Sequence, residues 1–357
     1  MKRFITAVLL TLLFPLFLFY CKKAPSVKIA LMTKFESGSI IGSSEAGAIN
    51  MYLEEKGIKN IEIIYADDAW NSEKAVTAYE ELKAKGIDIL ITSHISTCAV
   101  AIADKINRDR ILTFVTGAVT DELSNKDDYI LRNIQDVDKE QKSIAEYIRK
   151  NLPKPLLVIR DNNNYAYTDP ALKYFLEYFG RENVSIIDVS MSSIDYAALE
   201  KNMKKIRFKS VYLLIGGYKI GAGSIAQMAR KIEPSCSIMY TPWMNTPLIL
   251  ETAGPSISGS VMPAHYPPKK TDASLYAYLN RFRNKYGFAP TFISLNVYTA
   301  FELIDRALKS GASDPDAIKK FLLESGEIKT EFTSTLFNQW GDVDAPLYFI
   351  TDIPGEF

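Results

Sequence analysis

The sequence predicts an α/β protein of two lobes, each a Rossmann-like domain built on a parallel sheet. Short apolar runs, typical of strands that are buried on both faces, alternate with segments of helical length and spacing. This alternation occurs twice, before and after a polar stretch at 135–138 that we interpret as a crossover. A length of 357 residues is enough for two separate hydrophobic cores.

The first lobe is organised around the stretch 86–123, where apolar strands at 87–91 and 111–115 flank a helix at 99–110. A small, hydroxyl-rich turn follows each strand, at 92–98 and at 116–120. Because ligands bind beyond the carboxyl ends of parallel strands, these two turns are predicted to form one wall of a pocket. The other expected elements of this half are strands at 27–32, 61–65 and 129–134 and helices at 44–56 and 72–85.

The start of the helix that follows Ser96 has two interpretations. Its free backbone N–H groups and the positive end of its dipole would accept an anionic ligand group. Alternatively, Ser96 or Thr97 is an ordinary N-cap, which is a common use of hydroxyl side chains.

The second series repeats the pattern, with polar turns after its strands at 160–168, 216–218 and 241–245. A proline-rich stretch at 261–268 is the expected return crossover, and 335–342 with 347–351 is the expected closing hairpin. We therefore assign 27–134 and 263–328 to the first lobe, and 135–262 and 329–357 to the second. The expected elements are helices at 139–151, 170–179, 195–206, 223–231, 273–286, 296–309 and 314–324, and strands at 156–159, 184–189, 210–215 and 237–240.

The first 21 residues have the basic start and apolar run of an export signal. Leu18–Cys21 resembles a bacterial lipobox, in which the cysteine is acylated, although Tyr20 is bulky where a small residue is usual. An uncleaved anchor or cleavage elsewhere stays open. A periplasmic or cell-envelope location is expected in each case.

Composition excludes several classes of function. Basic and acidic residues balance at 42 each, so no nucleic-acid partner is expected. His94 and His265 are the only histidines and lie far apart, and the chain shows no metal-ligand spacing, P-loop or nucleophile motif. We therefore expect no enzyme, no cofactor and no metal. Cys98 and Cys236 fall in different lobes, which favours two free, buried thiols over a disulfide.

Several blocks together resemble a known family. The blocks are YADDAWNSEKAV from Tyr65, GIDILITSHIST from Gly86, TGAVTDEL from Thr116, GGYKIGAGSIAQMAR from Gly216 and LFNQWGD from Leu336. In this order and spacing they resemble the substrate-binding proteins of bacterial ABC importers for branched-chain amino acids and amides, over about 27–350. The resemblance implies the type I periplasmic binding fold, a Venus-flytrap arrangement whose lobes are joined by a multi-strand hinge.

The resemblance also implies ligand contacts on both sides of a cleft. Ser96 matches the hydroxyl that binds a ligand carboxylate, and Ile41 matches a bulky residue that packs on the ligand. The full set of expected ligand-binding residues is Ile41, Ser96, Thr97, Gly117, Ala118, Thr120, Tyr165, Tyr218 and Trp243.

Two positions depart from the family pattern. Trp243 stands where amino-acid binders often carry an acid that pairs with the ammonium, and Val119 stands where a threonine is usual. An unpaired buried ammonium is costly, so an aromatic, amide or carboxylate ligand becomes plausible. Trp243 and the two tyrosines would stack on a flat ligand, or else pack beneath a loop. Asp136 and Asp161 would replace the missing acid, or else serve as hydrogen-bonding residues of the hinge or as caps.

The expectation is thus an exported, monomeric solute-binding protein that is lipid-anchored through Cys21 and serves an ABC permease. The alternative is a ligand-sensing lipoprotein of the same fold that signals to a membrane receptor or an envelope enzyme.

Overall fold

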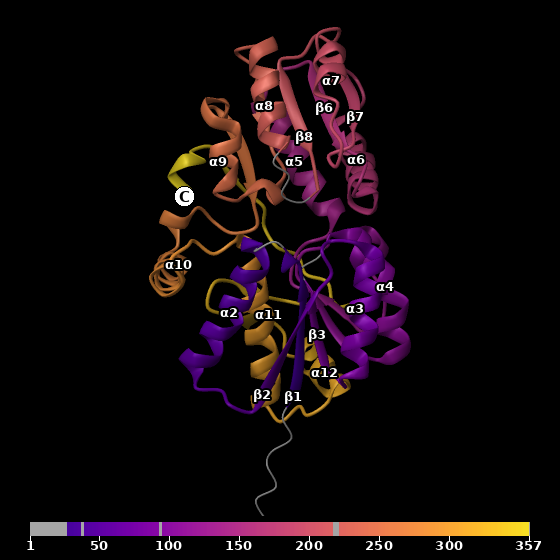
Figure 1. The fold of residues 1–357 in the computed structure, drawn as a ribbon, viewed down its shortest axis with the longest axis vertical. Helices are drawn as coiled ribbons and strands as arrows, with labels where there is room; N and C mark the ends of the chain where they lie inside the picture. The colour runs from indigo at the N-terminus through magenta and orange to yellow at the C-terminus, as the bar shows by residue number, and fades with distance from the viewer. Residues whose placement is uncertain (1–26, 37–38, 93–94, 217–220, 357) are drawn as a thin grey trace, which may run out of the picture.

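The computed structural model describes residues 27–36, 39–92, 95–216 and 221–356. Cys21, His94 and Tyr218 lie outside the described residues, as do the predicted signal and lipobox. Two α/β lobes are stacked along the long axis of the molecule (Figure 1). The predicted fold class, two lobes built on parallel sheets, is confirmed.

The first lobe contains a five-stranded parallel sheet in the order β2-β1-β3-β4-β5. Its strands are short and apolar because both faces are covered. Along β1, Ile29 and Leu31 belong to the core on one face, whereas Ala30 and Met32 belong to the core on the other face. The strands are β1 (Val27–Thr33), β2 (Ile61–Asp67), β3 (Ile89–Thr92), β4 (Leu112–Val115) and β5 (Ile130–Arg132).

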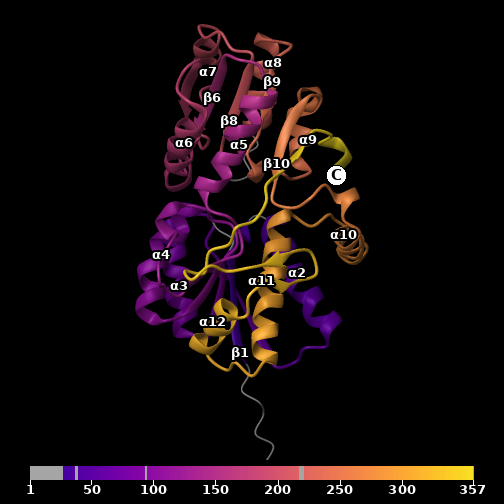
Figure 2. The same ribbon diagram turned by 180° about the vertical axis from the view of Figure 1, so that it is seen from behind.

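Helices from both ends of the chain cover this sheet. α2 and α11 lie side by side on one face, and α3 and α4 pack on the other (Figures 1 and 2). Gly47 of α2 lies against the Phe282 ring of α10, a contact that a larger side chain would crowd. The helices are α2 (Ile40–Lys56), α3 (Ser72–Ala84), α4 (Ser96–Asp109), α10 (Ala273–Tyr286), α11 (Phe292–Lys309) and α12 (Pro315–Glu324).

The second lobe contains a six-stranded sheet in the order β13-β10-β9-β8-β6-β7, in which only β13 is antiparallel to its neighbour. Its strands are β6 (Leu156–Asp161), β7 (Val184–Val189), β8 (Ser210–Leu214), β9 (Ser237–Met239), β10 (Ser260–Ala264) and β13 (Tyr348–Ile350). Its helices are α5 (Val137–Asn151), α6 (Tyr165–Phe179), α7 (Tyr196–Met203), α8 (Gly221–Ile232) and α9 (Leu248–Ala253). Across the described ranges, every helix is too short or too polar to cross a lipid bilayer.

The crossovers fix which ends of the strands meet between the lobes. β5 ends at Arg132, and the chain then passes into the second lobe, where α5 begins at Val137. Because the first sheet is entirely parallel, the carboxyl ends of its strands all lie at this boundary. β10 likewise ends at Ala264 just before the chain returns toward α10, so the parallel strands of the second sheet also end there. A third crossover leads into β13 (Figure 2).

The C-terminal segment differs from the predicted organisation. We assigned 329–357 to the second lobe and expected a hairpin between 335–342 and 347–351. Instead β11 (Ile328–Lys329) pairs with β12 (Ser334–Thr335), and β13 pairs with β10. The physical reason is burial, because the side chains of Phe332, Phe337 and Val343 complete the first-lobe core.

An ion pair anchors this segment to the first sheet. The Arg132 guanidinium, only 1% exposed, donates to the Asp342 carboxylate with nitrogen–oxygen distances of 2.8 and 2.6 Å. It also donates to the Thr120 carbonyl at 2.9 Å and to the Ser124 hydroxyl at 2.6 Å. These bonds hold the turn after β4, the end of β5 and the C-terminal segment together.

Candidate functional site

The start of α4 forms part of the first-lobe wall. Ile95 occupies the N-cap position and offers no side-chain cap, so Ser96 and Thr97 are the first two residues of the helix. The suggestion that either hydroxyl is the N-cap is therefore wrong. Among the described residues, the N–H groups of Cys98 and Ala99 donate to the Ile95 carbonyl at 3.0 and 3.3 Å, whereas those of Ser96 and Thr97 have no intrahelical acceptor. The Ser96 side chain beside them is buried. Ile41, the second residue of α2, is also buried.

The turn after β4 is tied to the rest of the structure at both ends. Gly117 and Ala118 are buried within it. The Thr120 hydroxyl accepts from the Glu122 N–H at 3.3 Å and thereby caps the 3-10 helix η2 (Asp121–Leu123). The Val119 carbonyl accepts from the Val137 N–H at 2.8 Å. This turn therefore connects the first lobe directly to the start of α5 in the second lobe.

On the second-lobe side, two predicted aromatic residues have different surroundings. Tyr165 is the first residue of α6 rather than part of the preceding turn, and its side chain is 61% exposed. Trp243 lies in the 3-10 helix η3 (Pro242–Met244) and is only 6% exposed. Its ring centroid lies 5.9 Å from Tyr167, 5.5 Å from His265 and 5.9 Å from Phe292. Trp243 thus packs within an aromatic cluster at the boundary between the lobes.

The two aspartates that were considered as replacement acids make local bonds. Asp136 is the N-cap of α5, where its carboxylate accepts from the Lys139 N–H at 3.1 Å. Asp161 ends β6, and its carboxylate accepts from the Asn163 N–H at 3.0 Å. The alternative interpretation, that Asp136 is a cap, is confirmed.

Glu140, which the sequence analysis did not single out, lies at the base of the aromatic cluster. It is fully buried in α5, and its Oε1 accepts from the Tyr167 hydroxyl at 2.8 Å and from the Gln141 amide at 3.0 Å. The Tyr212 hydroxyl in turn donates to Gln141 Oε1 at 3.0 Å. We call Glu140, Tyr167, Trp243 and His265 the hinge cluster, because they lie where the chain passes between the lobes.

The hinge cluster contains polar atoms that lack hydrogen-bond partners among the described residues. They are Glu140 Oε2, His265 Nε2 and Trp243 Nε1, and all three are buried. Glu140 Oε2 lies 4.0 Å from His265 Nε2, with the two side chains 0% and 6% exposed. Burial raises the pKa of Glu140 to about 7 and lowers the pKa of His265 to about 3. Burial therefore favours the neutral form of both groups.

A signal for Glu140 was present in the sequence. Val137, Glu140, Gln141, Ile144 and Ile148 recur at the three- and four-residue spacing of one helix face, and all five are buried. A glutamate at such a position points into the core rather than into solvent.

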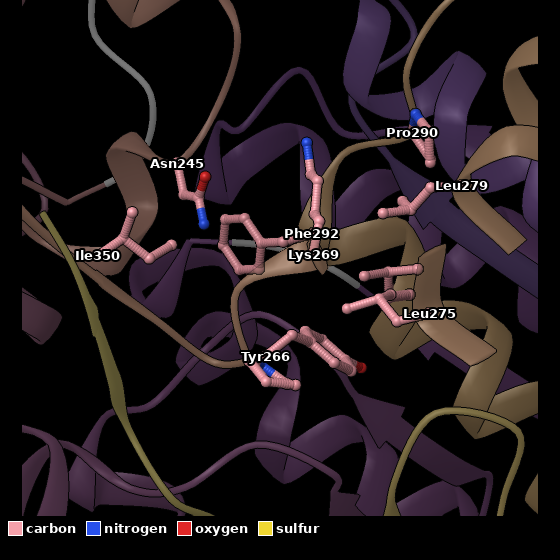
Figure 3. A pocket seen from close by; sticks show the side chains of 10 residues that line it. Asn245, Tyr266, Lys269, Leu275, Leu279, Pro290, Phe292 and Ile350 are labelled. Atoms are coloured by element: carbon pink, nitrogen blue, oxygen red, sulfur yellow. The ribbon is translucent and has the colours of Figure 1, made fainter. Parts of the chain in front are cut away.

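A recess is lined by residues from both lobes, among them Asn245 and Ile350 of the second lobe and Leu279 and Phe292 of the first (Figure 3). It has a volume of about 400 Å³, including space that is open to solvent. Figure 3 shows the Phe292 ring near its centre, with Asn245 on one side and Leu279 on the other. Phe292 also contacts His265, with ring centroids 5.5 Å apart, so one phenylalanine adjoins both the recess and the hinge cluster.

Among the described residues, no group of three or more histidine, cysteine or acidic side chains has the arrangement of a metal site. Cys98 and Cys236 are free and buried, as the sequence predicts. Asp67 is used structurally, because its carboxylate accepts from the N–H groups of Phe35 at 3.1 Å and Ala69 at 2.8 Å.

Comparisons with known proteins agree with this architecture. The family model described as "Periplasmic binding protein" matches residues 26–351. A Leu/Ile/Val-binding protein homolog 3 from Brucella melitensis is 22% identical over 310 residues, which covers 85% of this chain and 83% of that protein.

Solved structures share the fold. The branched-chain amino acid transporter substrate-binding protein LivJ from Streptococcus pneumoniae, in complex with isoleucine, has a TM-score of 0.82 at 19% identity, covering 92% of this chain and 97% of that one. A solute-binding protein of an ABC transporter from Rhodopseudomonas palustris, in complex with 3,4-dihydroxybenzoic acid, has a TM-score of 0.79 at 19% identity, covering 91% and 93%. Because the family model spans nearly all of the described residues, this chain belongs to the periplasmic binding protein family.

Proposed function

We propose that this protein is an extracytoplasmic solute-binding protein that captures a small polar or amphipathic molecule between its lobes for an ABC importer. The main support is that the carboxyl ends of the parallel strands in both sheets face the same boundary. A molecule that contacts both lobes there would favour a closed arrangement over an open one. The closed form would then be recognised by a permease.

An anionic group of the solute would be bound by the first lobe. The start of α4 would offer the N–H groups of Ser96 and Thr97 beside the buried Ser96 side chain, which suits a carboxylate. Gly117 and Ala118 would add backbone contacts, and Ile41 would pack on the apolar part of the solute. Thr97 and Thr120 would complete this wall, although the Thr120 hydroxyl already caps η2.

The second lobe would supply an aromatic wall. Trp243 would contact a flat or branched solute, and the exposed Tyr165 and Tyr218 of the family pattern are the other aromatic residues proposed to contact it, of which Tyr218 lies outside the described residues. Carboxylic acids are ligands in both solved relatives, since one structure contains isoleucine and the other 3,4-dihydroxybenzoic acid. We therefore propose a carboxylate-bearing ligand.

A thermal-shift panel of isoleucine, glutamine, benzoate and 4-hydroxybenzoate tests this function. A ligand at 100 times its Kd should stabilise the protein by about 2.7 kcal/mol. Trp243→Ala should abolish the shift without unfolding the protein, and so should Tyr218→Ala, whereas Tyr276→Ala, at an exposed position of α10, should leave the shift intact. A ligand whose affinity is unchanged by Trp243→Ala would refute the proposed pocket.

Export and anchoring need a separate experiment. We propose that the 1–21 segment directs export and that Cys21 is acylated, on the evidence of the sequence alone. Mass spectrometry of the mature N-terminus in the native host should find a lipid-modified Cys21 as the first residue. An unmodified cysteine would exclude the lipid anchor and leave the solute-binding function untouched.

A further inference from the structure

We propose that Glu140 and His265 together bind a hydroxyl group of the solute, so that the ligand is a hydroxylated carboxylic acid rather than an α-amino acid. This inference rests on the proposed function and deepens it, because it names the chemical class of the ligand. Its basis is the set of buried, unpartnered polar atoms in the hinge cluster.

The gap between the two side chains suits one bridging oxygen. At 4.0 Å, Glu140 Oε2 and His265 Nε2 are too far apart to hydrogen-bond directly. An oxygen about 2.8 Å from each atom would make an angle of about 90° between its two bonds, which a hydroxyl group tolerates. A larger group would have to push the two side chains apart within a tightly packed region.

The third unpartnered atom distinguishes a hydroxyl from an ammonium. Trp243 Nε1 can only donate a hydrogen bond, so its partner must accept one. The Trp243 indole lies near the Tyr167 phenol, with ring centroids 5.9 Å apart, and lowers the pKa of that phenol without reaching hydrogen-bond geometry; burial nevertheless raises this pKa well above its usual value. The same phenol donates to Glu140, so the indole faces the region around this carboxyl. A hydroxyl both donates and accepts, whereas an ammonium has no lone pair to offer.

Leaving these atoms unpaired is costly, which argues that they have a partner in the functional state. A buried donor or acceptor without a hydrogen bond typically costs about 1–3 kcal/mol, and here three occur together. The residues also come from separate parts of the hinge. Glu140 follows the first crossover and His265 follows β10 at the second. A solute hydroxyl at this point would connect both crossovers and so favour one arrangement of the lobes.

The test uses isothermal titration calorimetry with a matched pair of acids, 4-hydroxybenzoate and benzoate, with isoleucine as the ammonium-bearing probe. The wild-type protein should bind 4-hydroxybenzoate about tenfold or more tightly than benzoate, which corresponds to about one net hydrogen bond. Glu140→Ala and His265→Ala should each reduce this preference to about twofold or less while changing the benzoate affinity little. Tyr212→Phe removes the neighbouring hydroxyl that contacts Gln141, and it should keep the full preference.

A second measurement does not depend on variants that fail to fold. The chain has two histidines, so a ¹⁵N-histidine spectrum is assigned with one His94→Asn sample, which leaves the hinge cluster unchanged. The Nε2 signal of His265 should shift when 4-hydroxybenzoate binds and should stay in place when benzoate binds.

Several results would overturn the inference. Equal affinity for the two acids would overturn it. A hydroxyl preference that survives both alanine substitutions would also overturn it, because a buried water rather than the solute would then occupy the gap. Binding of isoleucine alone would overturn this inference and leave the proposed function standing. If none of the three probes binds, the inference fails and the proposed function loses its support as well.

Discussion

Substituting either member of the Glu140–His265 pair should make protein stability depend on pH, with opposite signs for the two variants. In the folded protein between about pH 5 and 6.5, Glu140 holds one proton because burial raises its pKa to about 7. His265 is neutral there because burial lowers its pKa to about 3. In the unfolded chain the same single proton resides on the histidine, whose ordinary pKa is 6.5, and not on the glutamate, at 4.5. Folding therefore moves this proton without net uptake, and the pair adds no pH dependence.

Each variant removes one half of this compensation. In Glu140→Gln, the pKa of the remaining His265 is lower in the folded protein than in the unfolded chain. Protons therefore bind the unfolded chain preferentially, and stability that is complete above pH 6.5 is lost as the pH falls. In His265→Asn the remaining Glu140 has a raised pKa, so its contribution is present below pH 4.5 and is lost as the pH rises through about 7. A difference of one bound proton between the folded and unfolded states changes the free energy of unfolding by about 1.4 kcal/mol per pH unit. Between pH 6.5 and 4.5, the stabilities of the two variants should therefore diverge from that of wild type by about 2–3 kcal/mol in opposite directions.

The assay is urea denaturation at pH 4.5, 5.5 and 6.5 at constant ionic strength, with the free energy of unfolding of each variant compared with that of wild type. Taking this difference cancels the titration of carboxyl groups elsewhere in the chain. The groups that face the pair are the phenols of Tyr167 and Tyr212, which do not ionise in this range, and Asp136, which acts on Glu140 electrostatically. Tyr212→Phe should run parallel to wild type. Slopes of the same sign in both variants, or no slope in either, would refute the reasoning.

Three other outcomes are expected. Arg132→Met leaves the buried carboxylate of Asp342 without its partner and should cost about 3–5 kcal/mol in urea denaturation; a loss below about 1 kcal/mol would contradict the role of this ion pair. Gly341→Ala should destabilise the protein well beyond its control Gly57→Ala, for which we expect a loss of about 1–2 kcal/mol. Both glycines have positive φ, at +85° and +65°, but only at Gly341 would the added carbon meet a neighbouring leucine. Similar urea midpoints for the two variants would argue against this close approach. The Cys98 thiol, whose pKa burial raises well above its usual value, should react with a thiol reagent at pH 8 only when the protein unfolds, and rapid native labelling would show that it is accessible.

The order of elements was predictable because each buried strand is a short, continuous apolar run. Boundaries were less predictable where a helix starts without a side-chain cap. α4 begins at Ser96 rather than at Ala99, and α6 begins at Tyr165, five residues before the predicted start at Pro170. At neither start does the N-cap side chain make a capping hydrogen bond.

The candidate site was less predictable than the fold, because its polar residues are assembled from distant parts of the chain. Trp243 was identified through a family pattern, but its contacts with His265 and Phe292 depend on how η3, β10 and α11 meet. Glu140 was overlooked because a charged residue in a helix is usually solvated. The assignment of 329–357 to the second lobe holds for β13 but not for Phe337, because this side chain could complete either core and only tertiary packing decides which one.

The way the first core is completed has a consequence for how the polypeptide matures. All five strands of the first sheet are present by residue 132, yet α11, which packs against α2, begins only at Phe292, and Val343 closes the same core. A nascent chain truncated after β10 should therefore expose an unfinished apolar surface and be prone to aggregation and proteolysis. Stable folding therefore requires nearly the whole polypeptide, so a truncation series should gain protease resistance abruptly near its C-terminal end rather than one lobe at a time.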